Sequence, residues 1–339
     1  MSINNTAFLQ ESSANEQLAQ LCKASADGLR LDILRVLSSD SFSVQELCQI
    51  LALKQSALSH HLKLLAAAEL VTTRREGNTV FYRRSVFSHE HLFADWQAAL
   101  FNSIDKCAVS AEQLQGIQQV EMARTASSKA FFLENASKFR EQQDLIASFE
   151  QYADSVATFI SGLELPVETQ HAKAIEIGPG DGRFLNFLSP LFGHISAYDN
   201  SSAMIAAAQQ TIANENLDNV TLVLGDSSLA KQQQNNADCV VINMVLHHIA
   251  SPAEVFADSA ALLKPGGALV ITDLCHHDQS WAKEACGDVW LGFEPDDLTL
   301  WAQTAGLLEG QSSFLAQRNG FRIQIRHFYK PSISPKGTP

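Results

Sequence analysis

The nine residues AIEIGPGDG, numbers 174–182, join a short apolar run to a turn that contains three glycines. Four more apolar runs follow, near residues 195, 220, 238 and 268, and the first two of them end in an acid, Asp199 and Asp226. Helical patterns separate the runs, and strands that alternate with helices are typical of a parallel sheet covered by helices. We therefore predict an α/β domain over residues 171–330.

Four motifs lie in this region. A Glu-x-Gly-x-Gly-x-Gly motif begins at Glu176, an acid ends the second strand at Asp199, Gly-Asp follows the third strand at residues 225–226, and a Lys-Pro-Gly-Gly turn occupies residues 264–267. In these motifs and their spacing the chain resembles the class I S-adenosylmethionine-dependent methyltransferases. The resemblance implies a Rossmann-like methyltransferase sheet that binds S-adenosylmethionine, or S-adenosylhomocysteine as an effector.

The side chains of these motifs suit an adenosyl ligand. Gly178, Gly180 and Gly182 leave room for the ligand to approach the backbone at the carboxyl edge of the sheet. Asp199 lies 17 residues past Gly182, where its carboxylate would accept hydrogen bonds from both ribose hydroxyls. Glu176 would orient the loop and hold the amino group. Asp226 and Ser227 would bind the adenine edge, and Asn243 and Met244 would line the methionine side. The residues predicted to bind the ligand are Glu176, Gly178, Gly180, Gly182, Asp199, Asn200, Asp226, Ser227, Asn243 and Met244.

A nicotinamide dinucleotide is the competing ligand for a glycine-rich turn of this kind. Its pyrophosphate would need a helix amino terminus without a neighbouring acid, whereas Glu176 and Asp181 flank this turn. A cationic sulfonium tolerates those acids, which favours the methyl donor. A Rossmann-like domain that keeps the glycines and binds nothing is a further alternative.

Residues 14–86 carry a different pattern. Apolar residues recur at helical spacing in three bursts, and Leu53-Lys54-Gln55 separates the last two helices. Residues 70–83 then read as two strands around a Glu-Gly-Asn turn. This order is that of a winged helix-turn-helix, and residues 26–34 and 55–65 resemble the ArsR/SmtB family of bacterial repressors. The resemblance implies a homodimer that binds double-stranded DNA.

Charge placement supports DNA binding by this domain. Between residues 54 and 84 the chain has six basic and two acidic residues, whereas the whole chain has a net charge of -13. The residues predicted to contact DNA are Gln55, Ser56, Ser59, His60 and Lys63 of the third helix, at base edges, and Arg74, Arg75, Arg83 and Arg84 of the hairpin, at phosphates. A basic hairpin that is only a solvated surface is the alternative.

Residues 87–170 form the predicted helical linker, which we also expect to provide dimerisation and a lid. They contain no proline before Pro166. A first apolar stripe is expected at a dimer interface, and a second, aromatic stripe is expected in the core or the lid. The stripes are Phe87, Leu92, Trp96, Leu100 and Ile104, and then Phe131, Phe132, Phe139, Leu145, Phe149 and Tyr152.

Metal sensing is common in the repressor family, but its paired cysteines are absent from the second helix, which has only Cys48. His89 and His91 after the hairpin are candidate ligands, although two histidines beside acidic residues are more typical of a helix surface. We therefore predict no metal site. Arsenite at Cys275 and Cys286 is a lesser alternative, since similar arsenite methyltransferases group several cysteines around the acceptor.

Methyl transfer is an in-line displacement that depends on positioning, so no particular catalytic side chain is required. A general base, where one is used, is expected among the histidines that follow the fourth and fifth strands. The predicted catalytic residues are His247, His248 and His276, and the first two also resemble a feature of ubiquinone-type methyltransferases. The acceptor is predicted to be a small molecule.

Composition limits the remaining classes. The net charge of -13 disfavours a general nucleic-acid coat protein or an anionic-membrane binder, and no apolar run approaches the length of a membrane span. Six cysteines without a CxxC pair fit a reducing compartment, so we expect a cytoplasmic protein. Residues 321–329 read as an edge strand, and residues 331–339 as a flexible tail.

Three functions fit these patterns. The first is a transcriptional regulator that senses the adenosyl ligand, and the second is a small-molecule methyltransferase whose winged helix regulates only its own expression. The third, DNA methylation, is disfavoured because residues 243–246 read Asn-Met-Val-Leu, unlike the Asn/Asp-Pro-Pro-aromatic motif of amino-methylating DNA enzymes. We predict the first, with a competent methyl-donor site.

Overall fold

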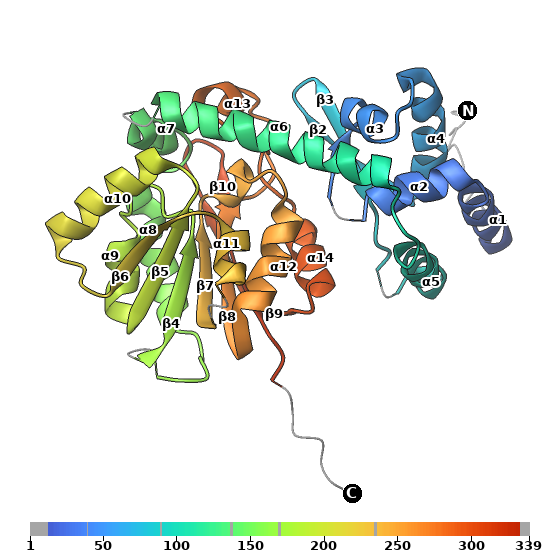
Figure 1. Ribbon diagram of the computed structural model, residues 1–339. Coiled ribbons are helices and arrows are strands. Elements are labelled where there is room, and N and C mark those ends of the chain that lie inside the picture. The colour runs from blue at the N-terminus through green and yellow to red at the C-terminus, as the bar shows by residue number, and fades with distance from the viewer. Residues whose placement is uncertain are drawn as a thin grey trace, which may run out of the picture. The chain divides into compact units, whose positions relative to one another are not determined.

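The computed structural model of the chain describes residues 13–332, apart from residues 39, 89, 136–137, 169–170 and 234–235. Most of the predicted tail and His89 therefore lie outside the described residues. The chain divides into a first unit, Met1–Val120, and a second unit, Glu121–Pro339. The predicted linker is thus shared between the two units, and one long helix of this segment belongs to both (Figure 1).

The first unit is a winged helix-turn-helix, as predicted. Its helices and strands are α1 (Ala14–Ser25), α2 (Gly28–Val36), β1 (Phe42–Ser43), α3 (Val44–Ile50), α4 (Gln55–Ala67), β2 (Val71–Glu76), β3 (Thr79–Arg84), α5 (Ala94–Asp105) and the first part of α6 (Ala111–Asn135). The strands form an antiparallel sheet in the order β1-β3-β2. The hairpin of β2 and β3 is the wing.

Local signals determine the helix-turn-helix. A capping box begins α3, because Ser43 Oγ accepts from the Glu46 amide and the Glu46 carboxylate accepts from the Ser43 amide. Ala52 has a φ of 53°, which turns the chain sharply before α4. Leu58 and Leu62 of α4 are fully buried, so the opposite, polar face of this helix is turned outward.

The second unit contains a seven-stranded sheet. Its strands are β4 (Lys173–Ile177), β5 (His194–Asp199), β6 (Val220–Leu224), β7 (Ala237–Asn243), β8 (Leu263–Leu274), β9 (Leu308–Ala316) and β10 (Arg322–Tyr329). They lie in the order β6-β5-β4-β7-β8-β10-β9. Neighbours from β6 to β8 are parallel, whereas β10 is antiparallel to both β8 and β9.

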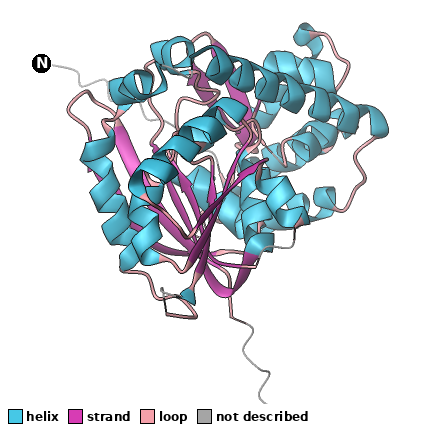
Figure 2. Ribbon diagram, turned by 60° about the vertical axis from the view of Figure 1, so that its left-hand side comes forward, coloured by secondary structure: helices cyan, strands magenta, loops and turns pink. Residues whose placement is uncertain are grey.

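Helices lie on both faces of this sheet (Figure 2). The second unit contains the second part of α6, α7 (Phe139–Ile146), α8 (Phe149–Ser161), α9 (Leu185–Leu188), α10 (Ser202–Glu215), α11 (Ser227–Gln232), α12 (Pro252–Leu262), α13 (Trp281–Cys286) and α14 (Pro295–Thr304). Val156 and Ile160 of α8 share one buried core with Ala174 of β4 and Val241 of β7. This is the predicted α/β fold. Within the described ranges, no helix is both long and apolar enough to span a membrane.

Strand β4 lies at the centre of the sheet, with β5 and β7 on its two sides. The strand order reverses at this point, and open α/β sheets bind ligands just outside the carboxyl ends of the strands there. The glycine-rich turn directly follows β4, and Asp199 ends β5. The topology therefore brings the predicted ligand residues to one edge of the sheet.

The prediction that residues 321–329 form an edge strand is wrong. β10 lies between β8 and β9, and its residues Ile323, Ile325 and Phe328 are buried. The edge strand beside it is β9, which the sequence analysis missed because its residues are mostly exposed. An alternating pattern marks the two faces of a strand, and it does not distinguish an edge strand from an interior strand.

Candidate functional site

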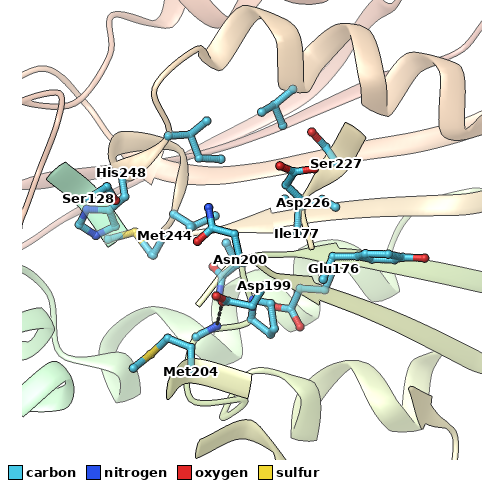
Figure 3. A pocket seen from close by; sticks show the side chains of 18 of the residues that line it. Ser128, Glu176, Ile177, Asp199, Asn200, Met204, Asp226, Ser227, Met244 and His248 are labelled. Atoms are coloured by element: carbon cyan, nitrogen blue, oxygen red, sulfur yellow. Dashed lines mark hydrogen bonds between the residues drawn. The ribbon is translucent and has the colours of Figure 1, made fainter. Parts of the chain in front are cut away.

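A pocket of about 250 Å³ opens at the carboxyl ends of β4, β5 and β7 in the second unit. Nine of the ten residues predicted to bind an adenosyl ligand line it. Glu176, Asp199, Asn200 and Met204 surround one part of this pocket (Figure 3). The pocket therefore coincides with the ligand position that the strand order indicates.

The glycine-rich loop needs its glycines for two different reasons. Gly178 lines the pocket with a φ of 70°, and a Cβ atom there would lie 2.5 Å from Val245 Cγ2. Gly182 does not line the pocket. It has a φ of 80°, and a Cβ atom there would lie 3.1 Å from the Ala208 backbone of α10. The structure thus gives Gly182 a packing role in place of the predicted ligand contact.

Two buried carboxylates face the pocket. Burial, together with the nearby Asp199 carboxylate, raises the pKa of Glu176 to about 8. Burial also raises the pKa of Asp199 to about 6, although its carboxylate accepts hydrogen bonds from the amides of Ser201 and Gly180. A positive charge nearby would stabilise the ionised form of both groups. The pocket is therefore suited to a cationic ligand.

Two buried oxygens in the pocket wall, Glu176 Oε2 and Asn243 Oδ1, have no hydrogen-bond partner among the described residues. Such groups cost free energy unless a ligand or water satisfies them. Met244, beside Asn243, has a φ of 53°, which is unusual for a residue with a side chain. An unsatisfied acceptor, Asn243 Oδ1, and backbone strain at Met244 therefore coincide at the carboxyl end of β7, as is typical of binding sites.

Asp226 and Ser227, predicted at the adenine edge, lie at one end of the pocket (Figure 3). Asp226 caps α11, because its Oδ1 accepts from the Leu229 amide. The Ser227 hydroxyl donates to Asp258 Oδ2 at 2.8 Å. The second carboxylate oxygen of Asp226 is thus available to a ligand, whereas the Ser227 hydroxyl is engaged.

His248 lies away from Asp226 and Ser227 (Figure 3), and it alone of the three predicted catalytic histidines lines the pocket. Its Nε2 lies 3.3 Å from Gln143 Nε2, and its Nδ1 lies 3.2 Å from the Gly287 carbonyl oxygen. Burial, and then the neighbouring His247, hold the pKa of His248 well below its usual value. The imidazole of His248 is therefore neutral at pH 7.

The structure places the other two predicted catalytic histidines outside the pocket. His247 is fully buried, and its Nδ1 lies 2.9 Å from Asp273 Oδ1. Burial lowers the pKa of His247, but the Asp273 and Asp288 carboxylates outweigh this effect and raise it to about 9. His276 Nδ1 lies 3.5 Å from Glu294 Oε1. Neither imidazole is placed to act on a substrate in the pocket, because position after a strand does not determine where a side chain points.

The exposed face of α4 carries the residues predicted to contact base edges. Gln55, Ser56, Ser59, His60 and Lys63 are all exposed. On the wing, Arg75 is exposed and Arg83 is partly exposed. Arg74 instead pairs at 2.7 Å with the buried Glu76 carboxylate, so its side chain is mostly occupied within the hairpin.

Arg84 is the clearest correction to the predicted DNA contacts. Its side chain is buried, and its Nε donates to the Leu34 carbonyl oxygen. Its two terminal nitrogens donate to the Asp105 carboxylate at 3.0 and 2.8 Å, and the guanidinium lies 4.6 Å from the centre of the Phe101 ring. Arg84 therefore stabilises the first unit and does not reach a phosphate.

Two protein families match the chain. The family described as a methyltransferase domain matches residues 139–308, about half of the chain, and the family described as a helix-turn-helix domain matches residues 26–74. The chain belongs to the methyltransferase-domain family. It joins a helix-turn-helix regulator domain of ArsR type to this methyltransferase domain.

Curated relatives match the two domains separately. The transcriptional activator HlyU of Vibrio cholerae is 49% identical over 78 residues, which are 23% of this chain and 72% of that protein. The ubiquinone biosynthesis O-methyltransferase of Xanthomonas axonopodis pv. citri is 24% identical over 176 residues, 47% of this chain and 74% of that protein. An uncharacterized 37.1 kDa protein in transposon TN4556 of Streptomyces fradiae is 33% identical over 101 residues, and the match spans 29% of each chain.

Helix α6 supplies residues of the methyltransferase domain that the sequence analysis missed. Glu121, Thr125, Ser128 and Phe132 line the pocket, and their spacing of four, three and four residues places them on one face of the helix. Burial, and then the Glu254 carboxylate, raise the pKa of Glu121 to about 7. The predicted aromatic stripe contained Phe132. For Glu121, Thr125 and Ser128, helical spacing is the one feature of the sequence that could have indicated a shared face.

The alternative of an arsenite site concerns two cysteines of the methyltransferase domain. Cys275 and Cys286 are buried and do not line the pocket. Burial raises the pKa of the Cys286 thiol to about 12, and burial also raises that of Cys275. Because the thiolate is the form that binds soft ions, these surroundings disfavour the arsenite alternative.

Proposed function

We propose that this protein is a transcriptional regulator that binds double-stranded DNA through its helix-turn-helix domain and an adenosyl ligand through its methyltransferase domain. The ligand is S-adenosylmethionine or S-adenosylhomocysteine, and it acts as an effector. The observation that carries the proposal is the pair of buried carboxylates, Glu176 and Asp199, in a pocket at the centre of the sheet. A homodimer is expected, since helix-turn-helix proteins read two half-sites.

Each part of the ligand has a proposed partner in the pocket. The Asp199 carboxylate accepts from the ribose hydroxyls, and Asp226 accepts from the adenine amino group. The amino group of the methionine part pairs with Glu176, whose Oε2 has no other hydrogen-bond partner among the described residues. Asn243 and Met244 lie along the methionine part.

The charge of the pocket favours this ligand over a dinucleotide. The acidic residues that line it are Glu121, Glu176, Asp181, Asp199, Asp226, Glu254 and Asp258. Arg183 is the one lysine or arginine among the described lining residues, and it already pairs with Asp181 at 3.2 Å. The ionised members of this acidic set would stabilise a sulfonium and repel a pyrophosphate.

Helix α6 offers a route by which the ligand can influence the helix-turn-helix domain. Within the first unit, Val120 is buried in the core, and a Cβ atom at Gly116 would lie 2.7 Å from the Ile50 Cα of α3. Within the second unit, Thr125 and Ser128 line the pocket. A ligand that changes the position or order of this helix would act on residues that also support α3, one of the two helices of the DNA-binding motif.

The test is the affinity of the full chain for an operator that the protein selects from random DNA. S-adenosylhomocysteine at saturation is expected to change this affinity by at least about fivefold, the lower end of ordinary allosteric coupling. Asp199→Asn should abolish the response, whereas Asp218→Asn, which alters an exposed carboxylate, should retain it. A chain that binds the ligand without any change in operator affinity would contradict sensing.

The affinity for S-adenosylmethionine is expected to rise with pH. Because the pKa of Glu176 is raised to about 8 and that of Asp199 to about 6, the free pocket holds protons that a cationic ligand must displace. Calorimetry should show affinity rising by up to about tenfold per pH unit between pH 6 and pH 8, where one proton is displaced, and levelling above pH 8. S-adenosylhomocysteine keeps the amino group and the ribose that face Glu176 and Asp199, so it should show a similar rise. An affinity that does not change between pH 6 and pH 8 for either ligand would contradict this account.

Small-molecule methyl transfer is the second candidate function. The pocket continues beyond the predicted ligand residues to Phe132, Phe149, Tyr152 and His248, which form a largely aromatic wall. Such a wall suits a planar acceptor. If ligand binding leaves operator affinity unchanged, this candidate survives, and the winged helix then regulates expression independently of the pocket.

A further inference from the structure

Three buried side chains of the methyltransferase domain direct ligand atoms at one another. They are His247, His248 and Asp288, and one nitrogen or oxygen atom of each lies within 4.8 Å of the others. Asp288 Oδ1 lies 3.9 Å from His247 Nε2 and 3.8 Å from His248 Nδ1. The exposed fraction of all three residues is 5% or less. Two imidazole nitrogens and a carboxylate oxygen therefore converge in a site closed to solvent.

The orientation of His247 is set from its other side. Asp273 Oδ1 lies 2.9 Å from His247 Nδ1, and both side chains are fully buried. A carboxylate at one ring nitrogen typically holds a metal-binding histidine in the tautomer that leaves the other nitrogen free for the metal. His247 Nε2 has no hydrogen-bond partner among the described residues, and it points into the cluster.

We propose that His247 Nε2, His248 Nδ1 and Asp288 Oδ1 bind a divalent metal ion of the zinc class. Imidazole with one carboxylate is a common donor set for Zn²⁺, and the bonds are about 2.0–2.2 Å long. Ligand atoms in a tetrahedral site of this size lie about 3.3 Å apart. The observed separations from Asp288 exceed this by about 0.5 Å, and the three ligand atoms all lie within 4.8 Å of one another, so metal binding requires the side chains to rotate toward the ion.

A fourth candidate ligand, a backbone oxygen, lies close to the cluster, and metal binding would also change the pocket wall. The Gly287 carbonyl oxygen lies 3.2 Å from His248 Nδ1 and is therefore close to the proposed metal position. His248 is the one member of the three that lines the adenosyl pocket. With a metal on Nδ1, the proton of the neutral ring must lie on Nε2, which faces Gln143. Metal occupancy would thus convert this part of the pocket wall from a hydrogen-bond acceptor to a donor.

A proton on His247 Nε2 is the competing explanation for the cluster. His247 would then be an imidazolium between Asp273 and Asp288, in agreement with its raised pKa of about 9. The two explanations differ in what is bound and not in the fold. The inference is independent of the proposed regulatory function, since it concerns metal binding in the absence of any adenosyl ligand.

The experiment is titration of the full chain with Co²⁺, followed by visible absorption, and then displacement with Zn²⁺. Exposed thiols also bind these ions, so Cys22→Ser and Cys107→Ser form the background. One Co²⁺ per chain is expected, with a spectrum that lacks thiolate bands. Asp288→Asn should weaken Co²⁺ binding by at least about 100-fold. Loss of a residue that only hydrogen-bonds to a metal ligand already costs about 10- to 100-fold in metal affinity, and Asp288 is itself a proposed ligand. Asp278→Asn, which alters an exposed carboxylate of the loop after β8, should bind as the parent does.

Thermal unfolding provides the second measurement. Zn²⁺ that binds the native chain should raise the Tm of the parent and of Asp278→Asn, but not that of Asp288→Asn. Circular dichroism of Asp288→Asn without metal checks that the variant is folded, and His248→Gln replaces it if it is not. Absence of stoichiometric Co²⁺ binding by the parent, or equal affinity in Asp288→Asn and the parent, would overturn the proposal in favour of the protonated histidine.

Discussion

Replacing Asp199 by asparagine is expected to weaken the binding of S-adenosylmethionine by at least about 100-fold. Two hydrogen bonds from ribose hydroxyls to a carboxylate contribute about 1.5–3 kcal/mol each, and a loss of about 3 kcal/mol corresponds to a factor above 100. The substitution also removes a negative charge beside the ligand. Isothermal titration calorimetry at pH 8.5, where the wild-type carboxylates are largely ionised, measures the effect.

Asparagine is the informative replacement because it spares the loop. Asp199 accepts from the Ser201 amide through Oδ1 and from the Gly180 amide through Oδ2, and the amide oxygen of asparagine can keep one of these bonds. Asp218→Asn, an exposed site beyond the pocket, is the matched control. An affinity of Asp199→Asn within about threefold of wild type would place the ribose elsewhere and remove the main support for an adenosyl pocket.

Replacing Arg84 by alanine is expected to destabilise the helix-turn-helix domain by about 3 kcal/mol. Breaking an ion pair in which both charges are buried costs about 3–5 kcal/mol; here Arg84 is buried but Asp105 is exposed and recovers its hydration, which places the effect at the lower end. The loss includes the bond to the Leu34 carbonyl and the packing on Phe101. Arg75→Ala, on the exposed wing, should change the free energy of unfolding by less than about 0.5 kcal/mol.

Hydrogen exchange followed by mass spectrometry measures peptides of each domain separately. It therefore reports this loss of stability without the assumption that the whole chain unfolds in one transition. Peptides from α2 should exchange about 100-fold faster in Arg84→Ala and unchanged in Arg75→Ala. Arg75→Ala is instead expected to affect DNA binding. It should lower the slope of the logarithm of DNA affinity against the logarithm of salt concentration by about one. An unchanged slope would remove Arg75 from the DNA interface, and unchanged exchange in Arg84→Ala would contradict its structural role.

Motifs with a fixed chemical purpose made much of the fold predictable. The glycine-rich turn after β4 and the acids at the ends of β5 and β6 indicated a parallel sheet with a ligand at its carboxyl edge, and the sheet has that form. The order of the strands in the sheet could not be predicted from the sequence, because the alternation of side chains describes the two faces of one strand and not its neighbours. For this reason the pattern of β10 does not reveal its interior position, and the exposed β9 carries no apolar pattern that would reveal it.

The site was predictable where the backbone must meet the ligand and less so where side chains point freely. Gly178 and Asp199, which were predicted to bind the ligand, line the pocket, whereas Gly182 packs against α10. His247 and His248 are neighbours in sequence, yet their rings enter different surroundings, and no pattern in the sequence distinguishes them. Asp288 is forty residues from His248 and comes near it through the turn after α13, so no spacing in the sequence links it to the two histidines.

Helix α6 also limits how this protein can be altered or divided. Its residues up to Val120 pack in one domain, and those from Glu121 line the pocket of the other, so a fragment cut at this point would leave both parts with a frayed helix end. Separate expression of either domain is therefore expected to need the whole of α6, with the boundary placed outside this helix.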